Sequence, residues 1–507
     1  MPADTKVPMD SAEHPDLDQR AREFLAAAWD GLEAQHVVPP PRFHPFLQVG
    51  TDYFGRGLDH LPEYKALESA ITAAHPRFGD DTPLPERAFA GQYVYSFLET
   101  AIAELTLDCE AFSTTAAAVD RAVSALKEAL KTVERQVACC RVVTHLTTLT
   151  GGPVDVAGVT VQPIARDPRS DVFSIIRDVI PGADSAFGRQ YPLVYGPPES
   201  VVVVREQGKR PFDASALASG KIEDFLLALR LLHAGTSDSL FEVRGETAPV
   251  REHGPTLERF RGDHSITSRT QMLRRETAIT SEDDSRFTGL HQLINAAKRD
   301  QPGMAFTSFV MAMQKFVLSY HAHAWYEQVV DLSTAFEAAL SGAATTDVTL
   351  RLCNRAAALL VTERDPATAI FDDIKVLYDL RSTLVHGGSL THKALRRKVY
   401  ALSTVPTEEM YGIALGYLVD RLRDLVRRSL LMRICLAARA EPLWPLGSDD
   451  GVDSSLADEA TRQVWRDAWR SELARIGATS SADRPRSAVR HLAPYSPSAG
   501  NEVVAPA

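Results

Sequence analysis

The sequence predicts a multidomain, mainly α protein in which an N-terminal α/β or α+β region precedes a C-terminal helical bundle. Its 507 residues are too many for one ordinary domain. Short β-branched runs bounded by Gly and Pro gather between about residues 141 and 245, which is typical of strands. From Pro302 to about residue 440, apolar residues recur at helical spacing almost without interruption.

The N-terminal part alternates between helical and strand-like stretches. Residues 1–15 are polar and contain prolines, so we expect them to be disordered. Helical spacing predicts helices over about 16–37, 87–107, 115–140 and 214–235. Strand patterns cover 141–151, 154–164 and 200–208, with a further candidate at 239–245. Residues 16–299 therefore form the α/β region, which is long enough for two subdomains.

The helical bundle is predicted over residues 302–440. One apolar stripe comprises Phe309, Met313, Phe316 and Tyr320, and the next comprises Val329, Leu332, Phe336 and Leu340. Further helices are expected over 348–362, from the cap Asp365-Pro366 onward, and from Pro406 onward. Residues 446–507 are predicted to be a linker, one short helix and a disordered tail rich in Ser, Pro and Ala.

Composition excludes several classes of protein. No apolar run approaches the roughly 18 residues that a membrane span needs, and the N-terminus lacks the pattern of a secretory signal. Five cysteines without CxxC spacing argue against a disulfide framework or a structural zinc site. No motif for a cofactor or a catalytic metal is present. We therefore expect a cytoplasmic protein without metal, cofactor or membrane contact.

Charge is distributed unevenly along the chain. The net charge of −11 argues against nonspecific nucleic-acid binding by the whole molecule. Residues 371–440 nevertheless hold twelve Lys or Arg against seven Asp or Glu, a local balance of +5. Part of this excess lies in HKALRRK (392–398) and part in RLRDLVRR (421–428). Each run is compatible with polyanion binding or with a solvated helix face.

The most informative stretch is LYDLRSTLVHGG (377–388), in which Arg381 stands five residues before His386. At about 100° per residue, the two side chains point about 140° apart on a straight helix. They converge only if the helix ends between them or if each meets its counterpart from a second subunit. Gly387 and Gly388 supply a helix terminator at that point. Taken alone, the stretch is most simply a helix end capped by Arg and His.

The neighbouring helices change this interpretation. DLSTAFEAALSG (331–342), LRLCNRAAALLV (350–361) and VLYDLRSTLVHGG (376–388) follow one another, each on its own predicted helix. This succession resembles the Apea-like branch of the HEPN family, small α-helical domains whose signature is Arg, four to six residues, then His. The third stretch is the most specific, through its aromatic-x-x-Arg-Ser-x-x-Val-His-Gly form. The resemblance covers about residues 302–440, under a third of the chain.

The resemblance implies an HEPN-type bundle that forms a homodimer in which two Arg-His motifs face each other across a cleft. Many HEPN domains are metal-independent endoribonucleases that act as toxins or in phage defence. Arg381 and His386 would then be catalytic. The imidazole would move protons at the 2′-hydroxyl and the leaving oxygen, and the guanidinium would bind the scissile phosphate of RNA.

Several further residues are candidates for supporting this chemistry. Lys393, Arg396, Arg397 and Lys398 follow the motif and could hold the RNA backbone. Ser382 stands where catalytic HEPN proteins often have Asn, Asp or His, so it would be a smaller polar helper. Glu337 could orient His386, or it belongs to an internal hydrogen-bond network. Arg351 and Arg355, one helical turn apart, either form salt bridges with acids such as Asp372 or Asp373 or face RNA.

Two other functions remain open. HEPN domains also occur as non-catalytic scaffolds that bind RNA, nucleotides or protein partners. Alternatively, the N-terminal α/β region is itself an enzyme, and the bundle is its dimerisation module. The leading interpretation is a regulated ribonuclease that serves phage defence or growth arrest. In that case the N-terminal region would sense a phage or cellular trigger.

Overall fold

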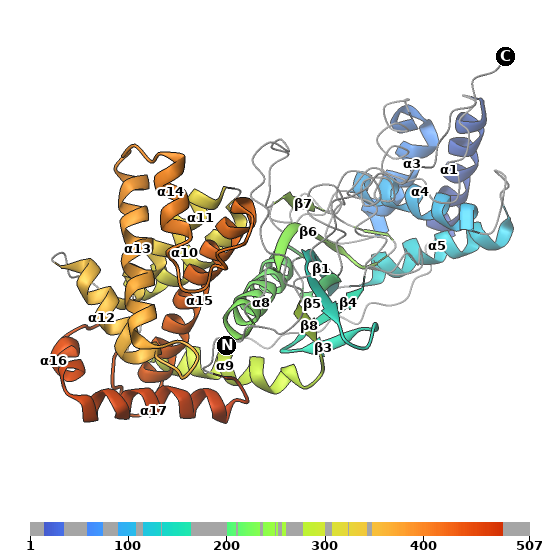
Figure 1. The fold of residues 1–507 in the computed structure, drawn as a ribbon. Coiled ribbons are helices and arrows are strands. Elements are labelled where there is room, and N and C mark those ends of the chain that lie inside the picture. The colour runs from blue at the N-terminus through green and yellow to red at the C-terminus, as the bar shows by residue number, and fades with distance from the viewer. Residues whose placement is uncertain are drawn as a thin grey trace, which may run out of the picture. The chain divides into compact units, whose positions relative to one another are not determined.

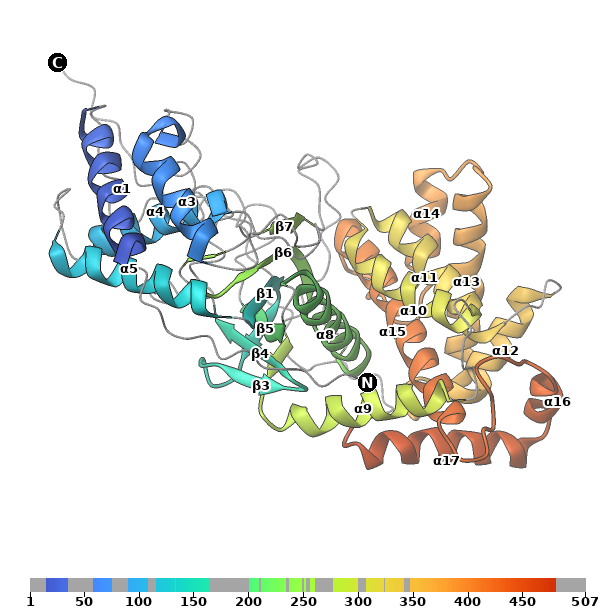
Figure 2. The same cartoon turned by 180° about the vertical axis from the view of Figure 1, so that it is seen from behind.

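The structure, a computed structural model, describes residues 15–34, 58–74, 90–107, 115–132, 134–163, 200–208, 211–233, 237–248, 250–251, 256–259, 277–299, 307–322, 324–341 and 347–479. Within these residues the protein is mainly helical with a small region of sheet, which confirms a mainly α, multidomain fold (Figures 1 and 2). None of the described helices is long and apolar enough to cross a membrane. The predicted disordered termini lie outside the described residues, except that Pro15 begins the first helix.

The chain divides into two compact units. The first comprises Met1–Thr144, Thr148–Asp224 and Ser239–Gly262, and the second comprises His145–Thr147, Phe225–Asp238 and Asp263–Ala507. Helices of the first unit enclose an apolar core: α1 (Pro15–Ala34), η1 (Leu58–His60), α3 (Pro62–Ala74), α4 (Ala90–Leu107) and α5 (Ala116–Lys131). In α1, Leu17, Phe24 and Ala28 recur at helical spacing and are buried, as the periodicity predicts.

A six-stranded sheet completes the first unit. Its order is β3 (Val154–Val156), β4 (Val159–Pro163), β5 (Ser200–Gly208), β1 (Arg135–Thr144), β6 (Asp238–Glu246) and β7 (Thr256–Arg259). A separate two-stranded sheet joins β2 (Leu146–Thr148) to β8 (Thr277–Ile279). Helix α8 (Pro211–Leu232) belongs to the first unit up to Asp224, and this part lies along the larger sheet, because Glu223 pairs with Arg141 of β1 and Ser219 donates to Glu242 of β6 (Figure 1).

The predicted helix over 115–140 is wrong in its second half. Helix α5 ends at Lys131, and the chain continues as β1, which pairs antiparallel with β5 from Arg135↔Gly208 to Val143↔Ser200. Cys139 and Cys140 are core residues of this strand, and neither side chain is exposed. Residues 135–144 form a strand because pairing with the valine-rich β5 satisfies their backbone hydrogen-bonding groups. Local spacing does not reveal this long-range partner.

Helices form the second unit almost throughout. They are α9 (Asp283–Ala297), α10 (Ser308–His321), α11 (Trp325–Leu340), α12 (Val348–Leu360), α13 (Ala367–Val385), α14 (His392–Val399), α15 (Tyr411–Ala437), α16 (Val452–Ala457) and α17 (Glu459–Arg475). Helix α15 lies at the centre, packed against α9, α10, α11, α12, α14 and α17. Its last two turns are buried on every side, so it is the core of the bundle.

The predicted bundle limits of 302 and 440 are too narrow at both ends. Helix α9 belongs to the second unit, although we placed it in the N-terminal region. It packs so closely against the end of α17 that a Cβ on Gly289 would lie 2.6 Å from Cγ2 of Ile476. The predicted linker after Trp444 is also part of the fold, because Trp444, Leu446 and Val452 are buried.

Helix α17 anchors this C-terminal extension to the bundle. Trp469 is fully buried and its Nε1–H donates to the carbonyl of Leu359, 3.2 Å away. Arg466 donates to the carbonyl of Ala358 at 3.1 Å, so two side chains of α17 satisfy the open end of α12. The compact unit therefore extends to about Ile476, where the chain is still buried.

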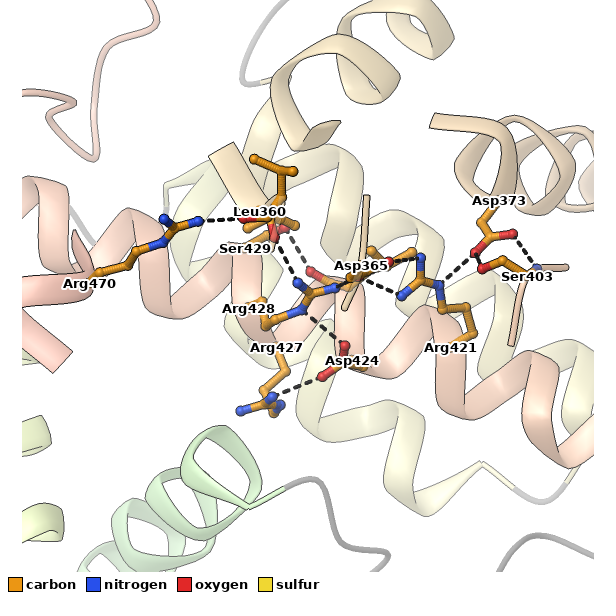
Figure 3. A network of polar contacts seen from close by, with 12 residues as sticks. Leu360, Asp365, Asp373, Ser403, Arg421, Asp424, Arg427, Arg428, Ser429 and Arg470 are labelled. Atoms are coloured by element: carbon orange, nitrogen blue, oxygen red, sulfur yellow. Dashed lines mark hydrogen bonds and ion pairs between the residues drawn. The ribbon is translucent and has the colours of Figure 1, made fainter. Parts of the chain in front are cut away.

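A buried ionic network fixes α13 to α15 (Figure 3). Both Nη atoms of Arg421 donate to the carboxylate of Asp365 at 2.9 Å, and its Nε donates to Asp373 at 2.8 Å. Arg428 also pairs with Asp365, and it donates to Asp424 at 3.0 Å. We predicted that Asp365 caps the N-terminus of α13, and this prediction is wrong. The helix begins at Ala367 behind Pro366, while the Asp365 side chain turns to the arginines.

The arginines hold these aspartates in their ionised form. Burial alone would raise the pKa of Asp365, but hydrogen bonds and charges from Arg421 and Arg428 outweigh it and lower that pKa. The pKa of Asp424 is likewise lowered, because the charges of Arg428 and Arg427 outweigh the effect of burial. RLRDLVRR is thus a structural core element, and its arginines do not form a surface for polyanions.

Candidate functional site

The LYDLRSTLVHGG stretch forms the last turns of α13 and its C-terminal cap. The N–H of His386 donates to the carbonyl of Ser382 at 3.1 Å, and that of Gly388 donates to Thr383 at 2.9 Å. Gly387 between them has φ +67°, which favours glycine. This is a Schellman-type cap, and it ends the helix where the two glycines predict. The backbone that carries His386 is therefore well defined.

Arg381 lies one turn and a half before the cap and contacts α11. Its Nη2 is 3.5 Å from Oε2 of Glu337, and its guanidinium lies 5.5 Å from the ring centre of Tyr378. The Nε of Arg381 is buried and has no hydrogen-bond partner among the described residues. The guanidinium therefore retains donors that no described protein group uses.

Tyr378 and Glu337 complete this cluster. The hydroxyl of Tyr378 donates to the same Oε2 of Glu337 at 3.0 Å. Burial and the neighbouring Glu337 raise the pKa of Tyr378 to about 12, so the phenol stays a donor at neutral pH. We did not single out Tyr378 from the sequence. Its position three residues before Arg381, on the same face of α13, is the signal that could have identified it.

His386 is exposed at the cap. Its side chain makes no hydrogen bond, ion pair or ring contact with any part of the chain that the structure describes. It contacts neither Arg381 nor Glu337. Of the two roles that we considered for Glu337, the structure therefore supports an internal polar network with Tyr378 and Arg381, and not orientation of His386 within one protomer. Ser382 is half-buried, and its carbonyl accepts from the N–H of His386.

The predicted RNA-contacting residues all lie on α14. Lys393, Arg396 and Arg397 are exposed, and none has an ion-pair partner among the described residues. Their spacing of three and four residues places them on one face of the helix. Lys398 differs, because it is mostly buried and pairs with Asp379 of α13. This ion pair ties the cationic helix to the helix that carries Arg381 and His386.

Other candidate groups are structural. Arg355 is buried and donates to both oxygens of Asp453, at 2.7 and 3.0 Å, and Arg351 lies 3.5 Å from the same carboxylate. The salt-bridge interpretation of these two arginines is confirmed, but their partner is Asp453 of α16 and not Asp372 or Asp373, the acids that we named. Among the described residues, no group of three or more His, Cys, Asp or Glu side chains could hold a metal ion.

Comparisons with known proteins do not extend this description. No family model, no curated protein and no solved structure matches the chain.

Proposed function

We propose that the protein is a metal-independent endoribonuclease in which Arg381 and His386 carry the chemistry. The observation that supports this most is the end of α13. An exposed imidazole lies on a cap that is closed by backbone hydrogen bonds, and a guanidinium with donors unused among the described residues lies five residues earlier on the same helix. Exposed Lys393, Arg396 and Arg397 on α14 supply cations for the RNA backbone.

The chemistry follows from the properties of these groups. His386 accepts the proton of the 2′-hydroxyl, whose oxygen attacks the adjacent phosphorus, and the bond to the 5′-oxygen breaks. Arg381 stabilises the negative charge that develops on the phosphoryl oxygens. The leaving 5′-oxygen takes a proton from the imidazolium that has formed, so the imidazole returns to its neutral form and the products are a 2′,3′-cyclic phosphate and a 5′-hydroxyl. No external nucleophile or metal ion is needed for this step.

A homodimer through an HEPN-type bundle would assemble this site. Arg381 and His386 of one protomer do not contact each other, and a straight helix separates their directions by about 140°. Two copies facing one another would bring the guanidinium of each beside the imidazole of the other. We propose that the N-terminal unit controls the nuclease in response to a phage or cellular trigger, because uncontrolled cleavage of RNA would harm the host.

A non-catalytic scaffold is the second candidate. The contact between Arg381 and Glu337 favours it, because a catalytic guanidinium must be available to phosphate. On this alternative the same surface binds RNA, nucleotides or a protein partner without cleaving RNA.

Incubation of labelled RNA with the protein in EDTA separates the two functions. Arg381→Ala and His386→Ala should each lower the rate at least about 100-fold, as expected for a lost acid-base or electrostatic group. Arg364→Ala and His60→Ala remove an exposed arginine and an exposed histidine elsewhere, and should leave the rate unchanged. Cleavage that survives both site substitutions would exclude the proposed residues. Binding without cleavage would favour the scaffold.

A further inference from the structure

Glu337 holds a position that a phosphate would need. Its Oε2 is the one charged group that contacts Arg381 among the described residues, at 3.5 Å from Nη2. Both side chains are reachable from solvent, with 22% of Arg381 and 32% of Glu337 exposed. An ion pair that is 3.5 Å long and partly open to solvent is weak, so Arg381 can exchange Glu337 for another anion.

Arg381 is poorly satisfied by Glu337 alone. A guanidinium carries five N–H donors, and here one carboxylate oxygen serves it while the buried Nε has no partner within the described residues. Arg421 in the same unit shows the contrast, because its Nε and both Nη atoms all donate to aspartates at 2.8 to 2.9 Å. An arriving anion with two oxygens would satisfy Arg381 better than Glu337 does.

Tyr378 gives Glu337 an alternative partner. The phenol donates to the same Oε2 that faces Arg381, so the carboxylate keeps one hydrogen bond when the guanidinium leaves it. The raised pKa of Tyr378 keeps this proton in place at neutral pH. Release of Arg381 therefore does not leave Glu337 without a donor, which lowers the free energy needed to exchange partners.

We propose that Glu337 is an internal competitor for the phosphodiester at Arg381, which it holds in the free protein and yields when RNA binds. This inference rests on the proposed RNA-binding role of Arg381. It assigns Glu337 a role opposite to that of a positioning residue. A positioning carboxylate would increase the affinity for RNA. A competitor lowers this affinity, most of all for RNA that makes few other contacts with the protein.

The sign of one substitution tests the proposal. Glu337→Gln removes the competing charge but keeps the shape and an oxygen that accepts from Tyr378. The affinity for RNA should rise about two- to fivefold, the range that a weak and partly exposed ion pair contributes. Tyr378→Phe should act in the opposite direction, because it frees Oε2 to pair fully with Arg381. The probe is a fluorescent 2′-O-methyl RNA, with binding followed by anisotropy in EDTA at fixed salt.

A double-mutant comparison shows whether the effect passes through Arg381. In the Arg381→Ala background, Glu337→Gln should change the affinity by less than the experimental error, because no guanidinium remains to be released. Asp372→Asn is the matched control, since it removes an exposed carboxylate of α13 that has no partner among the described residues. Thermal unfolding of each variant shows that it is folded before its affinity is compared.

The probe keeps this proposal separate from catalysis. Methylation of the 2′-oxygen removes the nucleophile, so affinity is measured whether or not the protein cleaves RNA. Tighter binding of Glu337→Gln without any nuclease activity would support the competitor and argue against the nuclease. Unchanged or weaker binding of Glu337→Gln, an equal gain in the Arg381→Ala background, or no RNA binding by any variant would overturn the competitor.

Discussion

Two arginine-rich runs in the second unit have similar sequences and opposite environments. In RLRDLVRR (421–428) the arginines are buried on α15, with Arg427 at 1% and Arg428 at 0% exposure, and they pair with aspartates. In HKALRRK (392–398) the cations of α14 are exposed, and Lys398 alone has an ion-pair partner within the described residues. The first run stabilises the bundle, and the second is available to a ligand.

The difference lies in the partners that the fold supplies. Asp365 lies just before α13 and Asp373 lies in its first half, both about fifty residues before Arg421 in the chain, and Asp424 comes from α15 itself. A buried charge is tolerated only when such partners neutralise it, whereas an exposed one needs none. Local charge density therefore does not distinguish a structural arginine from a binding one.

The largest loss of stability is expected when the aspartate partner of a buried arginine is removed. Asp365→Asn leaves Arg421 and Arg428 buried with one charge fewer between them, and should cost about 3–5 kcal/mol of unfolding free energy. Asp372→Asn, an exposed aspartate of the same helix, should cost no more than about 0.5 kcal/mol. Urea denaturation followed by circular dichroism measures both. Equal costs would mean that the buried network contributes no more than surface charges do.

Acid should weaken the buried network in a predictable direction. The pKa values of Asp365 and Asp424 lie below their ordinary value of 3.8, so the unfolded chain takes up protons before the folded one does. The stability that they provide is complete above pH 3.8 and is lost as pH falls through the lowered values. Unfolding free energy measured from about pH 5 to about pH 2 should therefore fall, and less steeply in Asp365→Asn. An identical slope in that variant would contradict the assignment.

Breaking the ion pair of Arg355 and Asp453 should cost an intermediate amount of unfolding free energy, between the costs for buried Asp365 and exposed Asp372. The arginine is buried, but half of the Asp453 side chain is exposed. Asp453→Asn should therefore cost about 1–2 kcal/mol, less than a fully buried partner because water compensates part of the lost charge. Asp450→Asn nearby removes an exposed carboxylate that accepts from Ser448, and should cost no more than about 0.5 kcal/mol. If Asp453→Asn lost as much unfolding free energy as Asp365→Asn, the exposure of the aspartate would not determine how much each ion pair stabilises the protein.

Local periodicity predicted most of the bundle because each of its helices buries one stripe. Val329, Leu332, Phe336 and Leu340 are all at most 2% exposed, as their spacing requires. The errors arose where long-range contacts decide. The strand β1 depends on β5, and the place of α9 depends on the contact of Gly289 with Ile476. Neither partner is visible in a local pattern.

The candidate site follows the same rule. The positions of Arg381 and His386 on α13 and the helix end at Gly387 could be read from one short stretch. The contact of Tyr378 and Arg381 with Glu337 could not, because Glu337 lies 41 residues before Tyr378 and reaches it only through packing of α11 against α13. Sequence therefore located the two residues that we propose as catalytic, but not the carboxylate that contacts one of them.

Substitutions of the exposed cations of α14 should have the smallest effect on stability. They should instead weaken RNA binding. Changing Lys393, Arg396 and Arg397 to Gln should alter the unfolding free energy by no more than about 0.5 kcal/mol per residue, because these side chains are exposed and form no ion pair within the described chain. If they bind RNA phosphates, the slope of log affinity against log salt should fall by about 0.7 for each phosphate that is no longer neutralised.

Lys398→Gln provides the internal control on the same helix. Its charge is already compensated by Asp379, and 19% of its side chain is exposed, so its loss should reduce affinity less than the loss of any of the other three. Fluorescence anisotropy with 2′-O-methyl RNA at several salt concentrations measures all four slopes. An equal loss of RNA affinity in Lys398→Gln would mean that a paired cation and cations without an ion pair contribute alike, which would contradict binding through the exposed face. Unfolding of the triple variant would show that α14 is a structural element like α15.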